Sequence, residues 1–317
     1  MATYNGEKFI SEQLNSILKQ SYQDFIIIIR DDDSTDNTPK IINSYAQKFP
    51  DKIKIVHDNV ICHDASKNFF QLMTYANSNY VMFSDQDDVW LPDKIKISIS
   101  KMKELEKIHG SNIPILVYAE ASLVDENLNI LRKIYIKIHR LELEKLIFSN
   151  HIAGCLCMMN RDLYKNIGKY FDTAWHDWFC ALFAVSCGEI FYINEITELY
   201  RQHENNVFNK RRTTEPTHKF NKIHRITKFI FNPFKKFASC KNNTRKIIYT
   251  IFMRANELKT RFAERIKPKY LNYINEIIEV YGRREKNKFI RIYKLFKYKL
   301  FNPEIGILNK IKLIMFI

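Results

Sequence analysis

Two clusters of carboxylates lie in the first hundred residues, and each follows an apolar run typical of a buried β-strand. The first cluster follows Arg30 and has four aspartates within residues 31–36. Neighbouring carboxylates repel one another, so a solvated acidic turn is one explanation, and helix capping accounts for Asp36. Capping does not account for Asp31 and Asp32, which follow the strand directly. A carboxylate in that position can accept hydrogen bonds from a nucleotide base or from ribose hydroxyls.

The second cluster occupies residues 84–88, after another apolar run. If the strand conformation continues through this stretch, Asp85 and Asp87 project from the same side of the chain. Hard carboxylate oxygens at that spacing suit Mg²⁺ or Mn²⁺, and either ion could hold a diphosphate there. A single D-x-D triplet is common by chance, and an acidic turn would also contain one. Its position at a second strand end, one strand–helix unit downstream of the first, favours a site.

A third candidate, Asp177, stands between His176 and Trp178 at the start of an apolar helical stretch. It could cap that helix or act as a general base. His151 and His203 border apolar or β-rich segments, and each taken alone is more typical of a structural histidine than of a ligand. The sequence contains no glycine-rich phosphate loop and no G-x-S-x-G elbow, so its residues indicate the chemistry of carboxylates with a divalent metal.

The elements that must position these residues alternate between strand-like and helix-like patterns. Strands followed by helices imply a parallel sheet with helices on both faces, and such sheets bind ligands at the carboxyl ends of their strands. Beyond residue 120 the pattern predicts a hairpin, two helices and two strands. The predicted strands are 25–29, 53–56, 80–83, 113–118, 155–159 and 190–193, the hairpin is 124–131, and the helices are 9–18, 36–49, 65–77, 93–108, 141–148 and 176–187.

Charge is distributed unevenly along the 317 residues, of which 46% are hydrophobic and 27% charged, as in folded proteins. Residues 201–317 contain 29 Lys or Arg and 8 Asp or Glu, a net charge of +21, which leaves −6 on the first 200 residues of a chain with +15 overall. This asymmetry predicts two domains with different roles, an α/β domain over residues 1–208 and a basic helical region over residues 209–317.

Basic and aromatic residues alternate in two stretches of the C-terminal region, residues 218–238 and 288–301. That mixture suits an anionic membrane surface. Helices packed on the α/β domain with solvated lysines would show the same mixture. We do not expect nucleic acid as a partner. The only features of the sequence that point to it are positive charge and aromatic content, which do not distinguish it from a membrane surface.

The cysteines predict free buried thiols and a reducing compartment, because none forms a C-x-x-C pair. On the predicted strand Cys155 and Cys157 would share one face. We also expect a cytoplasmic protein, attached to a membrane at most peripherally, because no signal peptide is visible and no apolar run approaches the roughly 20 residues of a membrane span. The six cysteines are Cys62, Cys155, Cys157, Cys180, Cys187 and Cys240.

Taken together, the motifs resemble those of family 2 glycosyltransferases, in particular a bacterial rhamnosyltransferase-like branch. The resemblance covers residues 1–208, and the basic region adds nothing to it. The motifs that carry it are MATYNG at 1–6, the helix at 12–20, RDDDSTDNT at 30–38, SDQDDVWLPDK at 84–94, HIAGC at 151–155, HDW at 176–178 and YRQHENN at 200–206.

The resemblance implies a GT-A fold, in which a mostly parallel central sheet has helices on both faces. It also implies transfer of a sugar from a nucleoside diphosphate donor, with inversion, to a polysaccharide or lipid-linked glycan. The branch favours dTDP-rhamnose or a UDP-sugar as the donor, at the inner face of the plasma membrane. By motif, Thr3, Asp31 and Asp32 would line the nucleoside pocket, and Asp85 would face the ribose or the donor sugar. Asn5 would also belong to the substrate-binding residues.

The remaining roles are also implied by the resemblance. Asp87 would ligate a divalent metal, Mg²⁺ or Mn²⁺, that neutralises the leaving diphosphate. Asp177 would take the proton from the acceptor hydroxyl. His203 would contact the metal or the diphosphate, and Arg201 would place a second cation nearby.

Two departures from the family pattern carry expectations of their own. Asp33 replaces the usual glycine, which takes a positive φ more readily than aspartate, so we expect a slightly strained turn there. Family members also have an apolar strand before the MATYNG motif, so we expect the first strand to be truncated here. Outside the family, the same residues would fit a non-catalytic nucleotide-binding protein with a basic membrane- or nucleic-acid-binding tail, or a nucleotidyltransferase.

Overall fold

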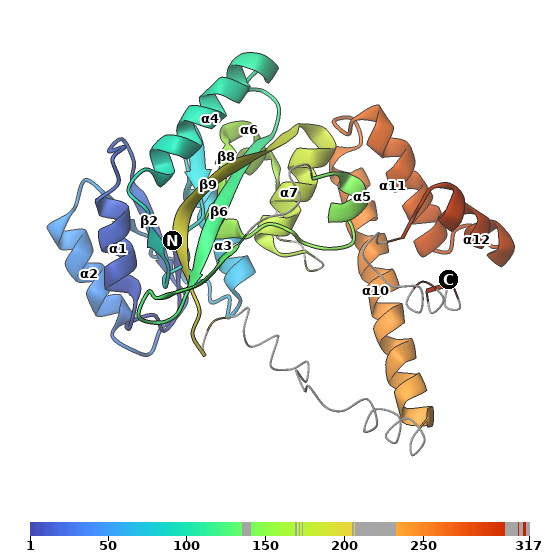
Figure 1. Cartoon of the computed structure of the whole chain (residues 1–317), viewed down its shortest axis with the longest axis horizontal. Helices are drawn as coiled ribbons and strands as arrows, with labels where there is room; N and C mark the ends of the chain where they lie inside the picture. Colours follow the sequence, from blue (N-terminus) through green and yellow to red (C-terminus); the bar gives the residue numbers. More distant parts are fainter. Residues whose placement is uncertain are drawn as a thin grey trace. The chain divides into compact units, whose positions relative to one another are not determined.

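The structure is a computed structural model, which describes residues 1–134, 141–168, 170, 172, 174–204, 206, 233–301, 310 and 313–314. The chain forms two compact units (Figure 1). The first contains Met1–Glu142 and Asn150–Gln202, and the second contains Leu143–Ser149 and His203–Ile317.

The first unit begins with a three-stranded parallel sheet, ordered β1-β2-β3. The central strand is the continuous β-branched run, and Ile27 and Ile29 are buried in it, as expected for a strand covered on both faces. Helices connect the strands and keep them parallel. These elements are β1 (Ala2–Thr3), α1 (Ile10–Leu18), β2 (Ile27–Asp31), α2 (Thr38–Lys48) and β3 (Ile53–Ile55).

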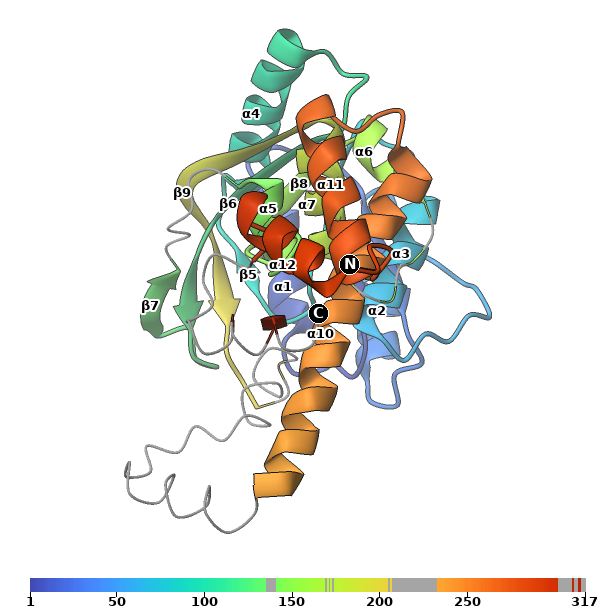
Figure 2. The ribbon, with the colours of Figure 1, turned by 90° about the vertical axis from the view of Figure 1, so that its right-hand side faces the viewer.

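The second sheet of this unit is ordered β4-β8-β6-β9-β5, with β7 also paired to β6. The long strands β6 and β9 lie side by side and are parallel (Figure 2), whereas the other four pairings are antiparallel. The backbone N–H of Ala2 donates to the carbonyl of Ser84 at 3.3 Å and links the two sheets. The strands are β4 (Tyr80–Met82), β5 (Val89–Trp90), β6 (Ile115–Val124), β7 (Ile130–Ile134), β8 (Cys157–Asn160) and β9 (Glu189–Arg201).

The expectation of a mostly parallel sheet is therefore wrong, because this architecture is mixed. A tight turn joins β6 to β7 at the predicted hairpin, and a hairpin can only be antiparallel. Strand β5 follows β4 after the short acidic turn and pairs with a different strand, β9, in the antiparallel sense. Apolar runs identify strands, but the direction of each pairing depends on the connection that follows it.

Helices cover both faces of the sheets in the first unit. One apolar core joins α1, α2 and α4 to the strands, with Leu14, Ile29, Met102 and Val117 among its members. Elsewhere α3 and α7 meet through the rings of Phe70 and Phe179, whose centroids lie 6.5 Å apart. Helix α7 is apolar on all sides and buried, as such a helix must be. The remaining helices are α3 (Ala65–Tyr75), α4 (Lys94–His109), the 3₁₀ turn η1 (Gly154–Leu156), α6 (Arg161–Asn166) and α7 (His176–Cys187).

Local details settle several sequence-based expectations. The φ of Asp33 is +67°, in the left-handed region that favours glycine, which gives the strain expected in this turn a backbone cause. Cys155 belongs to the 3₁₀ turn and Cys157 to β8, so the two do not share a strand face as predicted. Five cysteines are free thiols, as expected, namely Cys62, Cys155, Cys157, Cys180 and Cys187. Four of them are buried as predicted, whereas Cys62 is only half-buried.

The second unit is helical in its described parts, which confirms a helical C-terminal region. Its core joins α10 and α11, where Leu258 and Ile274 are completely buried. The basic stretch at residues 218–232 lies outside the described residues, and the one at 288–301 contains α12. In the described parts of the chain, no helix combines the length and apolar composition that a membrane span requires. The elements are α5 (Leu143–Leu146), α10 (Pro233–Phe262), α11 (Pro268–Tyr281) and α12 (Lys288–Lys297).

Candidate active site

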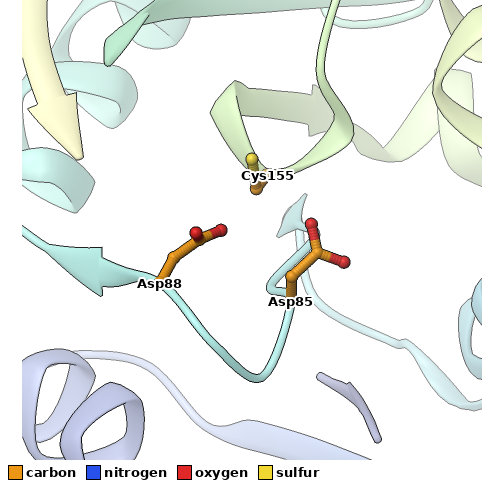
Figure 3. Close-up of side chains that lie close together, drawn as sticks. All are labelled: Asp85, Asp88 and Cys155. Carbon is orange, nitrogen blue, oxygen red and sulfur yellow. The ribbon is translucent and has the colours of Figure 1, made fainter. Parts of the chain in front are cut away.

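The acidic turn between β4 and β5 brings Asp85 and Asp88 together. Strand β4 ends at Met82 and the chain bends at residues 86–87, so strand alternation does not continue to Asp87 as the sequence suggested. One oxygen each of Asp85 and Asp88 and the sulfur of Cys155 all lie within 4.8 Å of one another. Figure 3 shows both carboxylates turned toward the space near Cys155. The convergent pair is thus Asp85 with Asp88, whereas Asp87 as a metal ligand stays a prediction from the resemblance.

Burial makes this pair electrostatically costly to ionise. Burial raises the pKa of Asp85 to about 8, and repulsion from Asp87, Glu198 and Asp177 adds to the rise. Asp88 is completely buried, and burial, followed by repulsion from Glu198, raises its pKa well above the usual range.

The two oxygens of Asp88 have different surroundings. Its Oδ1 accepts the backbone N–H of Arg201 at 2.9 Å, while its Oδ2 accepts no N–H or hydroxyl among the residues that the structure describes. The carboxyl of Glu198 lies within hydrogen-bonding range of Asp88 and raises its pKa further. A buried carboxylate oxygen without a donor, with other carboxylates close by, fits a hard divalent cation such as Mg²⁺ or Mn²⁺. The thiol of Cys155 does not fit as a ligand, because sulfur is soft and burial raises its pKa well above the usual range.

A buried ion pair supports the acidic turn. Lys94, at the start of α4, contacts the carboxylate of Glu198 in β9. Its Nζ also donates to the carbonyl of Cys155 at 2.7 Å and lies 4.5 Å from the centroid of the Trp90 ring. The side chains of Lys94 and Glu198 are 1% and 0% exposed. These contacts join α4, β5, η1 and β9 around the turn.

We expect Lys94→Met to lower the free energy of unfolding by about 3–5 kcal/mol, because it leaves the buried charge of Glu198 without its partner. Urea denaturation followed by circular dichroism measures the loss. The matched control is Lys101→Met, which breaks the more exposed pair with Glu104 and should cost about 0–1 kcal/mol. The double change Lys94→Met with Glu198→Leu should recover most of the stability. Equal losses at Lys94 and Lys101 would contradict the buried-pair argument.

Arg201 fixes the acidic turn from the end of β9. Its Nε donates to the carbonyl of Asp87 at 2.7 Å, and its guanidinium lies 4.6 Å from the centroid of the Phe9 ring. Its remaining N–H groups contact the carboxylate of Glu12 and the carbonyl of Glu126. Because the side chain is only 1% exposed, these contacts make Arg201 a positioning residue, and its role as a second cation for the substrate stays a prediction.

Three residues that the resemblance assigns to substrate binding lie together where β1 and β2 end, namely Thr3, Asn5 and Asp31. Thr3 Oγ1 donates to Asp31 Oδ1 at 2.7 Å. Asp31 also accepts the backbone N–H and the hydroxyl of Ser34, at 2.9 and 2.7 Å. Asn5 Oδ1 accepts the backbone N–H of Thr35 at 2.8 Å. These bonds order the first acidic turn.

Asp32 belongs to a buried charge network that sequence reasoning missed. Its Oδ1 accepts the N–H of Cys62 at 2.7 Å and faces Arg30 Nη1 at 3.3 Å. The guanidinium of Arg30 binds Asp58 through two hydrogen bonds of 3.0 and 2.9 Å and donates to Asn68 at 2.9 Å. The bonds from Arg30 hold the pKa of Asp58 well below its usual range.

Gln86 links the second acidic turn to the residues that follow β1. Its side-chain amide accepts the backbone N–H of Tyr4 and donates to the Tyr4 carbonyl, both at 2.9 Å. A Cβ at position 6 would lie 2.3 Å from Gln86 Oε1, so a larger residue in place of Gly6 would displace the Gln86 amide from this position. The residues after β1 are thereby held against the turn that follows β4.

Asp177 is buried near the start of α7 and is oriented on both oxygens. Its Oδ1 accepts the side-chain amide of Asn150 at 3.1 Å and the N–H of Trp178 at 2.6 Å, and its Oδ2 accepts the N–H of Gly154 at 3.1 Å. The N-cap residue of α7 is Trp175, so Asp177 does not occupy the capping position. Burial raises the pKa of Asp177 to about 6 although these hydrogen bonds lower it.

The histidines take different positions. His176 is buried between the rings of Phe69 and Phe83, at centroid distances of 4.3 and 4.7 Å. Burial lowers the pKa of His176 to about 3, so its imidazole is neutral at physiological pH. His203 follows the end of β9 and belongs to the second unit, so its role as a metal ligand stays a prediction.

The first unit therefore defines a GT-A-like α/β fold with a cluster of carboxylates, and comparisons with known proteins agree. Two solved structures share this fold. S. aureus TarS in complex with UDP-GlcNAc gives a TM-score of 0.56 at 16% identity, over 98% of this chain and 76% of that one. The mannosyltransferase PcManGT from Pyrobaculum calidifontis, in complex with GDP-Man and Mn²⁺, gives a TM-score of 0.52 at 13% identity, over 94% of this chain and 71% of that one.

A family model described as glycosyl transferase family 2 matches residues 1–168. The chain belongs to this family, and it is an enzyme of nucleotide-sugar-dependent glycosyl transfer. It is 35% identical over 221 residues to the dTDP-rhamnosyl transferase RfbG of Shigella flexneri, which covers 65% of this chain and 72% of the relative. It is 28% identical over 159 residues to the UDP-Glc:alpha-D-GlcNAc-diphosphoundecaprenol beta-1,3-glucosyltransferase WfgD of Escherichia coli. That alignment covers 50% of this chain and 57% of the relative. The resemblance inferred from the motifs is thus confirmed.

Proposed function

We propose that the chain transfers a sugar from dTDP-rhamnose or a UDP-sugar to a polysaccharide or lipid-linked glycan acceptor, with inversion and with a divalent metal, at the inner face of the plasma membrane. The observation that carries the proposal is the convergence of the Asp85 and Asp88 oxygens, with one oxygen of Asp88 that accepts no N–H or hydroxyl from the described residues. Two relatives support the choice of substrates, because their names state a dTDP-rhamnosyl donor and a diphosphoundecaprenol-linked acceptor.

The nucleoside of the donor is proposed to bind beside Thr3, Asn5, Asp31 and Asp32. The hydrogen bonds that order this turn hold the Asp31 carboxylate in one place, where its outer lone pairs can accept from a base or a ribose hydroxyl. Because Gln86 holds this segment against the second acidic turn, the diphosphate would extend from the nucleoside toward Asp85.

The metal would be held by Asp87, with Asp85 and Oδ2 of Asp88 beside it and His203 as a further contact. When bound, it would supply positive charge that stabilises the leaving diphosphate. Arg201 would keep the turn in position, because its guanidinium and backbone N–H bind Asp87 and Asp88.

Asp177 is the proposed general base. The acceptor hydroxyl oxygen forms a bond to the anomeric carbon, and the bond from that carbon to the diphosphate oxygen breaks. The diphosphate leaves with the electron pair, and the hydroxyl proton passes to the carboxylate of Asp177. Asn150 and the N–H of Gly154 orient this carboxylate, and its pKa of about 6 leaves it mostly ionised at neutral pH.

A panel of nucleotide sugars tests the proposal with the full chain, read by released nucleoside diphosphate with Mn²⁺, with Mg²⁺ and with excess EDTA. We expect one donor to turn over, only with metal, and proton NMR of the product to show an inverted anomeric carbon. Donor binding without turnover across the panel and with glycan acceptors would favour the non-catalytic alternative. Release of pyrophosphate in place of nucleoside diphosphate would indicate a nucleotidyltransferase.

A further inference from the structure

Helix α12 of the second unit presents aromatic side chains on the face opposite its buried side. Phe289, Tyr293 and Phe296 are 83%, 61% and 59% exposed. They recur at spacings of four and three residues, which places them on one side of the helix. Arg291 and Leu295, which are 9% and 0% exposed, occupy the other side and attach the helix to the unit. We refer to Phe289, Tyr293 and Phe296 as the aromatic face.

Exposure on this scale is unusual for large side chains. Single exposed apolar residues are normal on soluble proteins, but several on adjacent turns form a continuous patch that marks an interaction surface. Ile290, at 41% exposed, widens the aromatic face. Asn287 caps the start of α12, because its side-chain oxygen accepts the N–H of Phe289 at 2.9 Å. This N–H therefore does not depend on a binding partner.

The charge around the aromatic face is almost entirely positive. Residues 282–301 contain eight basic residues and one acidic residue. Lys294 is paired with Glu276 and Glu279, and Arg291 donates to backbone carbonyls, so these two cations bind the unit itself. The other basic residues of this segment are exposed, namely Arg283, Arg284, Lys286, Lys288, Lys297 and Lys299.

We propose that the aromatic face docks onto an anionic lipid surface. Aromatic side chains are stabilised at the boundary between headgroups and acyl chains, and surrounding lysines and arginines are attracted to anionic headgroups. Charge complementarity favours this partner over a second copy of the chain, because two copies facing each other through α12 would bring their basic residues together. α12 itself contains no acidic residue that could pair across such an interface.

The inference deepens the proposed function by naming the surface that would hold the enzyme beside a lipid-linked acceptor. It rests on the described geometry of α12, and its test measures binding without transfer, so the two proposals can fail separately. From the sequence, residues 288–301 are expected to suit an anionic membrane surface, and the aromatic face names the side chains that would contact it.

The test is co-sedimentation of the full chain with phosphatidylcholine vesicles, with and without phosphatidylglycerol. The test variant carries Phe289→Ser, Tyr293→Ser and Phe296→Ser. The control carries Ile108→Ser, Ile130→Ser and Leu131→Ser, which removes three apolar side chains of the first unit that are 66%, 66% and 58% exposed. We expect the wild type and the control to bind phosphatidylglycerol vesicles, the test variant to bind about tenfold or more weakly, and high salt to weaken binding.

A second readout remains available if the test variant fails to fold. In a Phe289→Trp chain, the added indole should shift its emission to shorter wavelength with phosphatidylglycerol vesicles and not with phosphatidylcholine alone. The proposal is wrong if the wild type stays in the supernatant at low salt, if the folded test variant sediments like the wild type, or if the Trp emission does not move. It is also overturned if the aromatic face mediates self-association while vesicles fail to bind.

Discussion

Asp177→Asn is expected to slow sugar transfer by about 10²–10⁴-fold while donor affinity stays unchanged. The amide is nearly the same size as the carboxylate and removes the oxygen that takes the proton. Its carbonyl oxygen can still accept one of the hydrogen bonds that now come from Asn150, Trp178 and Gly154. Steady-state release of nucleoside diphosphate gives the rate, and isothermal titration with the donor gives the affinity.

The pH profile separates a base from a merely structural carboxylate. Burial raises the pKa of Asp177 to about 6, so the base is ionised above that pH and becomes protonated below it. Wild-type kcat should therefore fall about tenfold per pH unit below about 6, and the Asn variant should lack this limb of the profile. The matched control, Asp51→Asn, changes an exposed aspartate and should keep the wild-type profile. A near-normal rate for Asp177→Asn would limit Asp177 to a structural role.

Asp87→Asn is expected to raise the Mn²⁺ concentration for half-maximal transfer by about 10²-fold or more. Each carboxylate ligand contributes a large share of the affinity for a hard cation, and an amide oxygen carries no full charge to replace it. The hydrogen bond from Arg201 should survive the change, because it is made to the backbone carbonyl of Asp87. Activity titrations with Mn²⁺ give the requirement, and thermal melts check the fold.

The wild type should in turn lose transfer in excess EDTA and regain it when Mn²⁺ is restored. The control Asp51→Asn should match the wild type in both respects. If Asp87→Asn needs the same Mn²⁺ concentration as the wild type and is still inhibited by EDTA, Asp87 is not a metal ligand. The ligands would then be other residues, and the converging Asp85 and Asp88 are the candidates.

Sequence periodicity predicted most elements but not their assembly. Helix α7 spans the predicted residues 176–187, because a polar start followed by a wholly apolar run is a strong local signal. The mixed direction of the sheet was missed, since an apolar strand such as β8 looks the same whether its neighbours are parallel or antiparallel. Pairing direction is a property of connections and packing, which no single run of residues contains.

The site shows the same division between local and long-range information. The motif around Asp85 was found because acidic residues followed an apolar run. The convergence of Asp88 on Asp85 could not be predicted, because it depends on the bend at residues 86–87. The pair of Lys94 and Glu198 joins residues 104 positions apart, and only the folded chain brings them together.

The two hydrogen bonds between Gln86 and Tyr4 have a mechanical consequence. Tyr4 is held at both its N–H and its carbonyl, so it cannot shift along Gln86 without breaking both bonds. The neighbouring Asn5 donates its backbone N–H to Ser34 Oγ at 2.8 Å, which continues the connection to the first acidic turn. A displacement of one acidic turn should therefore be transmitted to the other through residues 4 and 5.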